Sequence, residues 1–124
     1  MSRNSKNSPK NGEKYVISLD SFEKNGFIKK GQLLKTYSIY VHSTTQNNTN
    51  KSNFYVMRYS VKQKLKTGLI KSFVVGGPLI NNNQRQSFKT LTNGDSIIIH
   101  NIFADGPNGI EKLSDELIFV VKEI

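Results

Sequence analysis

The chain has 124 residues, of which 35% are hydrophobic, and it contains no cysteine. This length suits one domain with a single core. Without cysteine, the chain has no disulfide framework, no thiolate zinc site and no cysteine nucleophile. The sequence holds no run of about 18 apolar residues, so it predicts no membrane span.

The net charge of +9 is concentrated in the middle of the chain. Residues 24–94 hold twelve Lys and Arg and no Asp or Glu, whereas residues 95–124 hold two bases and six acids. Such an asymmetry predicts an acidic partner, which can be a protein, a membrane surface or a nucleic acid. The alternative is that the charge serves solubility alone.

Residues 1–14 are expected to form a flexible basic tail ahead of a single β domain at residues 15–124. The segment has no large apolar residue between Met1 and Lys14, so it cannot bury enough surface to offset the entropy lost on ordering. It also lacks the apolar stretch that a secretory signal requires.

Alternation of apolar and polar residues predicts that most of the domain is strand. The expected strands cover residues 15–20, 36–42, 54–66, 69–75, 96–104 and 116–122. Residues 43–53, rich in Asn and Thr, are expected to form an exposed loop. One short helix is expected within residues 81–91, with Asn83 as its N-cap. Together these elements indicate an antiparallel sandwich or barrel of six or seven strands.

The longest expected strand, which starts at Phe54, has opposite chemistry on its odd and even positions. The odd positions are predicted to face the core: Tyr55, Met57, Tyr59, Val61 and Leu65. The even positions are predicted to form a cationic outer face: Arg58, Ser60, Lys62, Lys64 and Lys66. A turn at Thr67-Gly68 would then bring Lys71 opposite that face. We expect the partner to bind at Arg58, Lys62, Lys64, Lys66 and Lys71.

The same region leaves open a second kind of partner. Tyr40, Phe54 and Tyr55 lie near the basic strand in sequence, and aromatic rings beside a cationic sheet are typical of proteins that bind single-stranded nucleic acid. Lysines on an edge strand also commonly serve only to prevent aggregation.

Other residue clusters do not indicate catalysis or a cofactor. His42 and His100 are on different predicted strands, without the spacing of a metal site. Gly76-Gly77-Pro78 lacks the following Lys-Ser/Thr of a phosphate loop. Four carboxylates flank a predicted turn and are expected to be solvated: Asp105, Glu111, Asp115 and Glu116. We therefore expect a protein that is not an enzyme and uses no cofactor or metal.

Near the C-terminus, a glycine-led strand is followed by a Gly-Pro-Asx-Gly turn, a basic residue and a leucine. The positions that carry this pattern are Gly94, Ile97, Ile99, Ile102, Ala104, Gly106, Pro107, Asn108, Gly109, Lys112 and Leu113. The pattern resembles the C-terminal domain of the GldM (PorM) family of the Bacteroidetes gliding and type IX secretion machinery, in which Asp is usual where Asn108 stands. About half of the chain takes part in the resemblance.

The resemblance implies an Ig-like antiparallel β-sandwich that binds proteins of the cell envelope, with Gly106, Pro107, Asn108 and Gly109 as a structural turn. It would place the protein in the periplasm. The sequence therefore predicts a non-enzymatic protein–protein interaction module. The alternative is a basic β-domain that binds nucleic acid, which would place the protein in the cytoplasm. Neither the partner nor the oligomeric state follows from the sequence.

Overall fold

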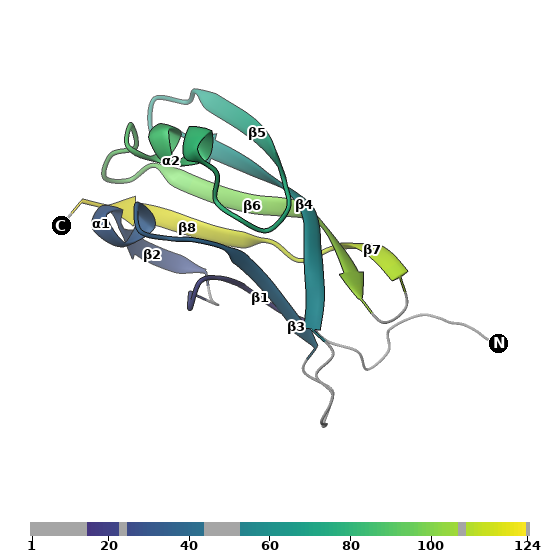
Figure 1. Cartoon of the computed structure of the whole chain (residues 1–124). Helices are drawn as coiled ribbons and strands as arrows, with labels where there is room; N and C mark the ends of the chain where they lie inside the picture. Colours follow the sequence, from purple (N-terminus) through teal and green to yellow (C-terminus); the bar gives the residue numbers. More distant parts are fainter. Residues whose placement is uncertain (1–14, 23–24, 44–52, 107–108, 124) are drawn as a thin grey trace.

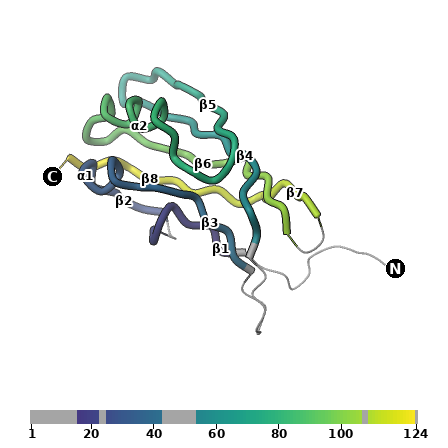
Figure 2. The backbone as a smooth tube through the Cα atoms, in the orientation of Figure 1, coloured from purple at the N-terminus to yellow at the C-terminus, as the bar shows by residue number. Residues whose placement is uncertain are grey.

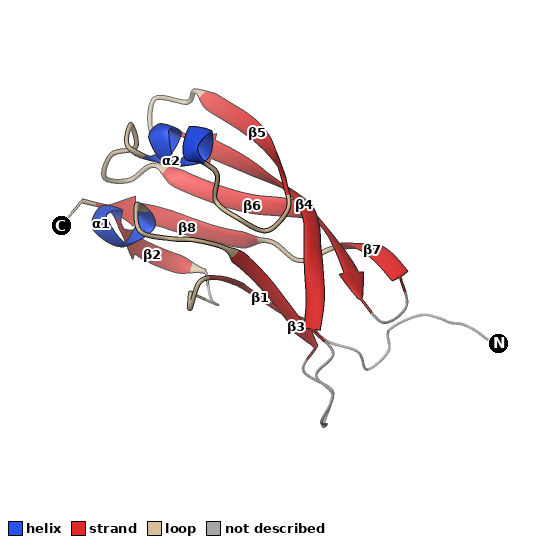
Figure 3. Cartoon of the chain, in the orientation of Figure 1, coloured by secondary structure: helices blue, strands red, loops and turns tan. Residues whose placement is uncertain are grey.

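A computed structural model describes residues 15–22, 25–43, 53–106 and 109–123 of the chain. These residues form mostly β structure with two short helices (Figure 1, Figure 3). The elements are β1 (Tyr15–Leu19), β2 (Gly26–Lys29), α1 (Lys30–Leu33), β3 (Ile39–Ser43), β4 (Asn53–Lys64), β5 (Ile70–Gly76), α2 (Asn82–Phe88), β6 (Ser96–Gly106), β7 (Gly109–Leu113) and β8 (Leu117–Lys122). The expected N-terminal tail, most of the Asn/Thr loop, and Pro107 and Asn108 lie outside the described residues.

The prediction of a mainly β chain is confirmed, and six of the strands match expected ones: β1, β3, β4, β5, β6 and β8. The sequence pattern does not predict β2, β7 or α1. β2 has only four residues and begins at Gly26, and Asn25-Gly26 indicates a turn more strongly than so short a run indicates a strand. β7 has two charged residues among its five, so its apolar pattern is weak.

The strands form one curled sheet in the order β1-β3-β4-β6-β8-β2, with β5 paired to β4 and β7 paired to β6. All pairings are antiparallel except that of β2 with β8. The sheet curls into a half-barrel, so that the β1 end approaches the β8 and β2 end (Figure 1, Figure 2). The ring of Phe22, just after β1, meets the ring of Phe119 on β8 edge to face, with centroids 6.3 Å apart.

The inner side of the curl holds one hydrophobic core, to which every strand contributes. The largest fully buried apolar side chains are Leu19, Ile28, Leu33, Ile39, Tyr59, Phe88, Leu91, Ile97, Ile99, Ile102 and Phe119. Burial of such side chains contributes about 1.5–3 kcal/mol each. We call this side of the sheet the inner face, and the opposite side the outer face.

Helix α2 covers the inner face of β4, where Ser87 Oγ donates to the buried Gln63 Oε1 at 3.0 Å. Its N-cap is Asn81, whose side chain accepts from the Gln84 N–H at 2.8 Å. The prediction of Asn83 as the cap was therefore wrong, because Asn81 has the extended backbone that a cap requires and Asn83 lies in the first turn.

Near Met57, strand β4 switches from having its even-numbered positions on the inner face to having its odd-numbered positions there. The switch occurs because the ladder with β6 shifts register on either side of Arg58. Before this point the even-numbered Phe54 and Val56 are buried, and after it the odd-numbered Tyr59 and Val61 are buried. A β-bulge adds one residue to a strand and so reverses which positions face inward. The prediction that Tyr55 and Met57 face the core was therefore wrong: Tyr55 is 58% exposed and Met57 is 39% exposed.

Strand β6 has a matching irregularity at Asn101, whose φ of 49° lies in the left-handed region that Asn tolerates. Both irregularities lie between the pair Val56↔Ala104 and the pair Ser60↔His100. From one pair to the other, β4 and β6 advance by the same number of residues. The extra residue of β4 is thus balanced by one of β6, and the ladder regains its register.

Candidate functional site

Three cations of β4 lie together on the outer face of the sheet, and we call Arg58, Lys62 and Lys64 the cationic face. The alternation that buries Tyr59, Val61 and Gln63 directs these side chains to the opposite side. Neither β4 nor its hairpin partner β5 contains an Asp or Glu. No carboxylate of the described residues forms an ion pair with Lys62 or Lys64. Among the described residues, the lysines of the cationic face are thus available to pair with carboxylates of a partner.

Apolar side chains flank the cationic face on β5. Lys64 pairs with Ile70, and Ser60 pairs with Val74; Ile70 is 52% exposed and Val74 is 70% exposed. Exposed β-branched residues beside unpaired cations resemble the make-up of a binding surface, in which apolar contact supplies affinity and charge supplies orientation.

On the other side of β4, Arg58 is held in place by β6. Its guanidinium carbon lies 4.4 Å from the centroid of the Phe103 ring, in a cation–π contact. Arg58 pairs with Phe103 across the ladder, so the bulge that reverses the parity of β4 also brings the two side chains together. A guanidinium fixed over a ring loses less freedom when it binds a carboxylate.

The structure separates the other two predicted cations from this group. Lys71 pairs with Gln63, whose side chain is buried on the inner face, so Lys71 is directed to the inner side, and its expected place opposite the cationic face was wrong. Lys66 follows the end of β4, and its side chain packs where a Cβ on Gly94 would lie. Its backbone N–H donates to Asp95 Oδ1 at 2.9 Å, which makes Lys66 part of the turn beyond the strand.

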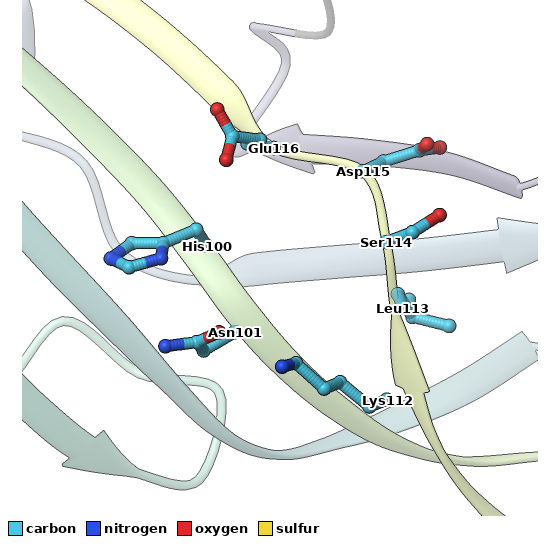
Figure 4. Close-up of a pocket in the computed structure, with 7 residues that line it drawn as sticks. All are labelled: His100, Asn101, Lys112, Leu113, Ser114, Asp115 and Glu116. Carbon is cyan, nitrogen blue, oxygen red and sulfur yellow. The ribbon is translucent and has the colours of Figure 1, made fainter.

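Two shallow hollows on the outer face are adjacent, because Asn101 and Lys112 line both, and we call the pair the groove. The first, of about 380 Å³, lies between β6 and the β7–β8 loop (Figure 4). The second, of about 340 Å³, is lined by Arg58, Ser60, Val74, Asn101, Phe103 and Lys112. In Figure 4 Lys112 reaches toward Asn101, whereas Ser114 and Asp115 point away from β6. The groove therefore leads from the β7–β8 loop to the cationic face.

The groove opens where β6 has no strand beside it. β8 pairs with β6 at residues 96–99 and β7 pairs with it at residues 102–106, so His100 and Asn101 face the loop that joins β7 to β8. The sequence predicts that Glu111, Asp115 and Glu116 are, with Asp105, solvated carboxylates around a turn. Asp105, Asp115 and Glu116 are indeed exposed, and Asp115 and Glu116 lie at this end of the groove.

The titratable groups with shifted pKa values lie outside the groove and have structural roles. Burial alone would raise the pKa of Asp95. Hydrogen bonds from the backbone N–H groups of Thr92 and Lys66 and from the Thr92 hydroxyl, with the charge of Lys66, outweigh it, and the pKa of Asp95 is lowered. Burial raises the pKa of Tyr59, although the charge of Arg85 opposes this. The Tyr59 hydroxyl donates to the Leu79 carbonyl at 2.8 Å.

The described residues contain no group of three or more His, Cys, Asp or Glu that could hold a metal ion. Within the same residues, no helix is long and apolar enough to cross a membrane. The cationic face and the part of the groove beside it offer positive charge, a guanidinium, an amide group and apolar side chains, whereas Asp115 and Glu116 line the far end of the groove. Chemically, this surface suits the binding of carboxylate-bearing and apolar side chains.

Several residues of this surface could not be found from the sequence. The sequence predicts Phe103 and Lys112 only as part of a strand and of a turn motif, and Ile70 and Val74 only as part of a hairpin strand. One signal was available for the irregularity of β6: Asn101 interrupts the apolar run from Ile97 to Phe103, and Asn is enriched among residues with positive φ.

A scan against protein-family models finds no family that matches this chain. A search of curated proteins finds no similar sequence.

Proposed function

We propose that this chain is a non-enzymatic protein–protein interaction module whose contact surface is the cationic face and the groove beside it. The observation that carries the proposal is the grouping of Arg58, Lys62 and Lys64 on one face, with no ion-pair partner in the described part of the chain and beside the exposed Ile70 and Val74. Charged residues around an apolar centre give specificity and fast encounter with a partner of opposite charge. The proposed partner is therefore acidic on the surface that meets β4.

We further propose that the module is an Ig-like sandwich related to the C-terminal domain of GldM, with a partner in the cell envelope. The residues that carry the resemblance build consecutive elements, namely β6, the β6–β7 hairpin and β7. Gly94 and Gly109 have φ values of 95° and 100°, a conformation that favours glycine. The curl of the sheet and the Phe22–Phe119 contact support a sandwich-like arrangement.

A second candidate function, binding of single-stranded nucleic acid, is favoured by one observation. The buried Val41 and Phe54 pair across β3 and β4, so Tyr40 and Tyr55 beside them face outward, at 42% and 58% exposure. Exposed tyrosines near cations are a stacking platform for bases. Phe54, expected to belong to this platform, is instead buried.

The test compares two variants with equal changes in net charge. Lys62→Glu/Lys64→Glu reverses the cationic face, and Lys35→Glu/Lys89→Glu reverses two exposed lysines elsewhere. Proteins captured from an envelope extract by the wild-type chain would be identified, purified and titrated by calorimetry. We expect the first variant to weaken binding by about tenfold or more, or about 1.4 kcal/mol, and the second to leave it nearly unchanged.

Salt dependence separates the two candidate functions. Binding of a mixed-sequence oligonucleotide through Z phosphate contacts should weaken with a log–log slope near −0.7Z for a single strand. A protein contact with an apolar centre should be less sensitive, since salt screens mainly its rim. Tight, steeply salt-dependent oligonucleotide binding, with no purified protein partner, would favour the second function over the first.

A further inference from the structure

We infer that the free edge of β5 accepts an acidic, extended segment of the partner protein as an additional strand of the sheet. This inference rests on the proposed function and specifies how the partner is held. Among the described strands, β5 pairs with β4 alone, and it forms one rim of the molecule in Figure 1. An edge of this kind presents a row of backbone donors and acceptors to any extended chain.

The hydrogen bonds at the two ends of the β4–β5 ladder show which backbone groups are free. The Leu65 N–H donates to the Leu69 carbonyl at 2.9 Å, and the Gly77 N–H donates to the Met57 carbonyl at 2.7 Å. Bonded and non-bonded pairs alternate along an antiparallel ladder. Lys71, Phe73 and Val75 therefore bond to β4. Ile70, Ser72 and Val74 direct their N–H and carbonyl groups away from it, toward the open edge.

Edge β5 lacks the features that usually prevent strand addition. Proteins protect edges with short strands, prolines, bulges and charged side chains. β5 has seven residues, more than the five of β1, the four of β2 or the five of β7, which also lie at edges. It contains no proline, and its one charged residue, Lys71, is directed to the inner face.

The charges around β5 favour an acidic occupant. Lys62 pairs with Ser72, and Lys64 pairs with Ile70, so both lysines lie one strand from the edge. An added strand would lie two strand spacings from β4, about 10 Å. The short side chain of Ser72 leaves room for Lys62 to reach over β5 toward it. A second copy of this chain would bring its own lysines to the same place, so charge favours an acidic partner over self-association.

The two faces of β5 also specify the pattern of the segment. Its outer positions would meet the lysines, while its inner positions would cover Phe73, which is partly buried and packs against the core. Because side chains of a strand alternate between faces, acidic and apolar residues should alternate in the segment.

The experiment uses a peptide with blocked termini in which valine and glutamate alternate, and its length matches the seven residues of β5. A second peptide has lysine in place of glutamate. Ser72→Pro removes an outward N–H and places a ring at the edge, but breaks no bond to β4, and proline is tolerated at such positions. Ser72→Thr keeps the N–H and is the matched control. Thermal melting of each variant checks that the fold is retained.

We expect the wild-type chain and Ser72→Thr to bind the glutamate peptide, and Ser72→Pro and Lys62→Glu to bind it at least about tenfold more weakly. The lysine peptide should not bind. Amide exchange should slow at Ser72 and Val74 when the glutamate peptide binds. Exchange at Lys71 and Phe73 should stay unchanged, because these amides are already bonded to β4.

Three results would overturn the inference. If the peptide binds wild type and Ser72→Pro equally and only Lys62→Glu/Lys64→Glu weakens it, the edge is not used and the proposed function stands. If neither peptide binds while an oligonucleotide does, the edge inference and the proposed function both fail. If Ser72→Pro abolishes self-association in a chain that binds neither peptide, the occupant of the edge is a second copy.

Discussion

The ring of Phe54 lies directly against Gly106, at the place where any other residue would carry its Cβ. Gly106 ends β6 and pairs with Gly109 across the β6–β7 hairpin, while Phe54 lies near the start of β4. The glycine of the turn motif is thus required by a ring from a strand about fifty residues earlier. Its φ does not lie in the left-handed region, so the requirement is one of space.

This contact predicts that Gly106→Ala destabilises the protein. The added methyl group should displace the Phe54 ring and cost about 1–3 kcal/mol, as overpacking usually does. Gly76→Ala is the matched control, because a Cβ there meets no atom within 4 Å and its φ is ordinary. Its effect should stay within about 0.5 kcal/mol. Urea denaturation of both variants checks the difference, and equal effects would contradict this account of Gly106.

Because the bulge reverses which positions of β4 face inward, substitutions at two neighbouring positions should differ in their effect on stability. Val56→Ser should cost about 2 kcal/mol or more, because it places a hydroxyl in the core. Tyr55→Ser should change the free energy of unfolding by less than about 0.5 kcal/mol, since Tyr55 is exposed. Chemical denaturation measures both. The reverse order would show that the alternation runs unbroken through Met57.

A third prediction concerns Arg85, whose guanidinium donates hydrogen bonds to three backbone carbonyl groups. Its Nη1 donates to the Leu34 and Thr36 carbonyls at 3.0 and 2.6 Å, and its Nη2 donates to the Ile80 carbonyl at 3.1 Å. Arg85→Met should leave these carbonyls without a donor and cost about 2–3 kcal/mol. Arg85→Lys should recover part of this loss, since an ammonium can satisfy some of them. A thermal melt in which Met and Lys variants match wild type would contradict the role.

Asp95 predicts the pH dependence of stability. Its folded-state pKa lies below its unfolded value, so the unfolded chain binds the proton more readily. The stabilisation by Asp95 should therefore be fully present above about pH 4, the unfolded pKa. It should be lost as pH falls through the lower folded-state value. Asp95→Asn should reduce the free energy of unfolding at neutral pH by about 2 kcal/mol, and the free energy of this variant should depend less on pH in the acidic range. Denaturation at several pH values tests this, and the same acidic pH dependence in variant and wild type would count against it.

Much of the fold could be predicted because its strands show local patterns. In β3 the buried Ile39 and Val41 alternate with Tyr40 and His42, and β6 is apolar on both faces, as a strand between others should be. The bulge at Met57 left no such local trace. Tyr55 and Met57 are as apolar as core residues, and only the ladder with β6 shows that they face outward.

The candidate site was predictable only in part, for a related reason. Arg58, Lys62 and Lys64 follow the bulge, where period-two alternation holds, and the structure groups them as expected. Lys66 and Lys71 lie beyond the strand end and across the hairpin, where their direction depends on pairings such as that of Lys71 with Gln63. The groove depends on where β7 and β8 part from β6, which no short stretch of sequence specifies.

The parallel pairing of β2 with β8 has a consequence for how the chain folds. It joins residues 26–29 to residues 119–122, so the first of these strands gains its neighbour only when nearly the whole chain is available. On a ribosome, β2 and the following α1 would leave the exit tunnel well before their partner is made. Long-range closures of this kind slow folding and leave apolar surface such as Ile28 uncovered in the meantime. The hairpin of β4 and β5 can form as soon as both strands are available, because they are joined by a short turn.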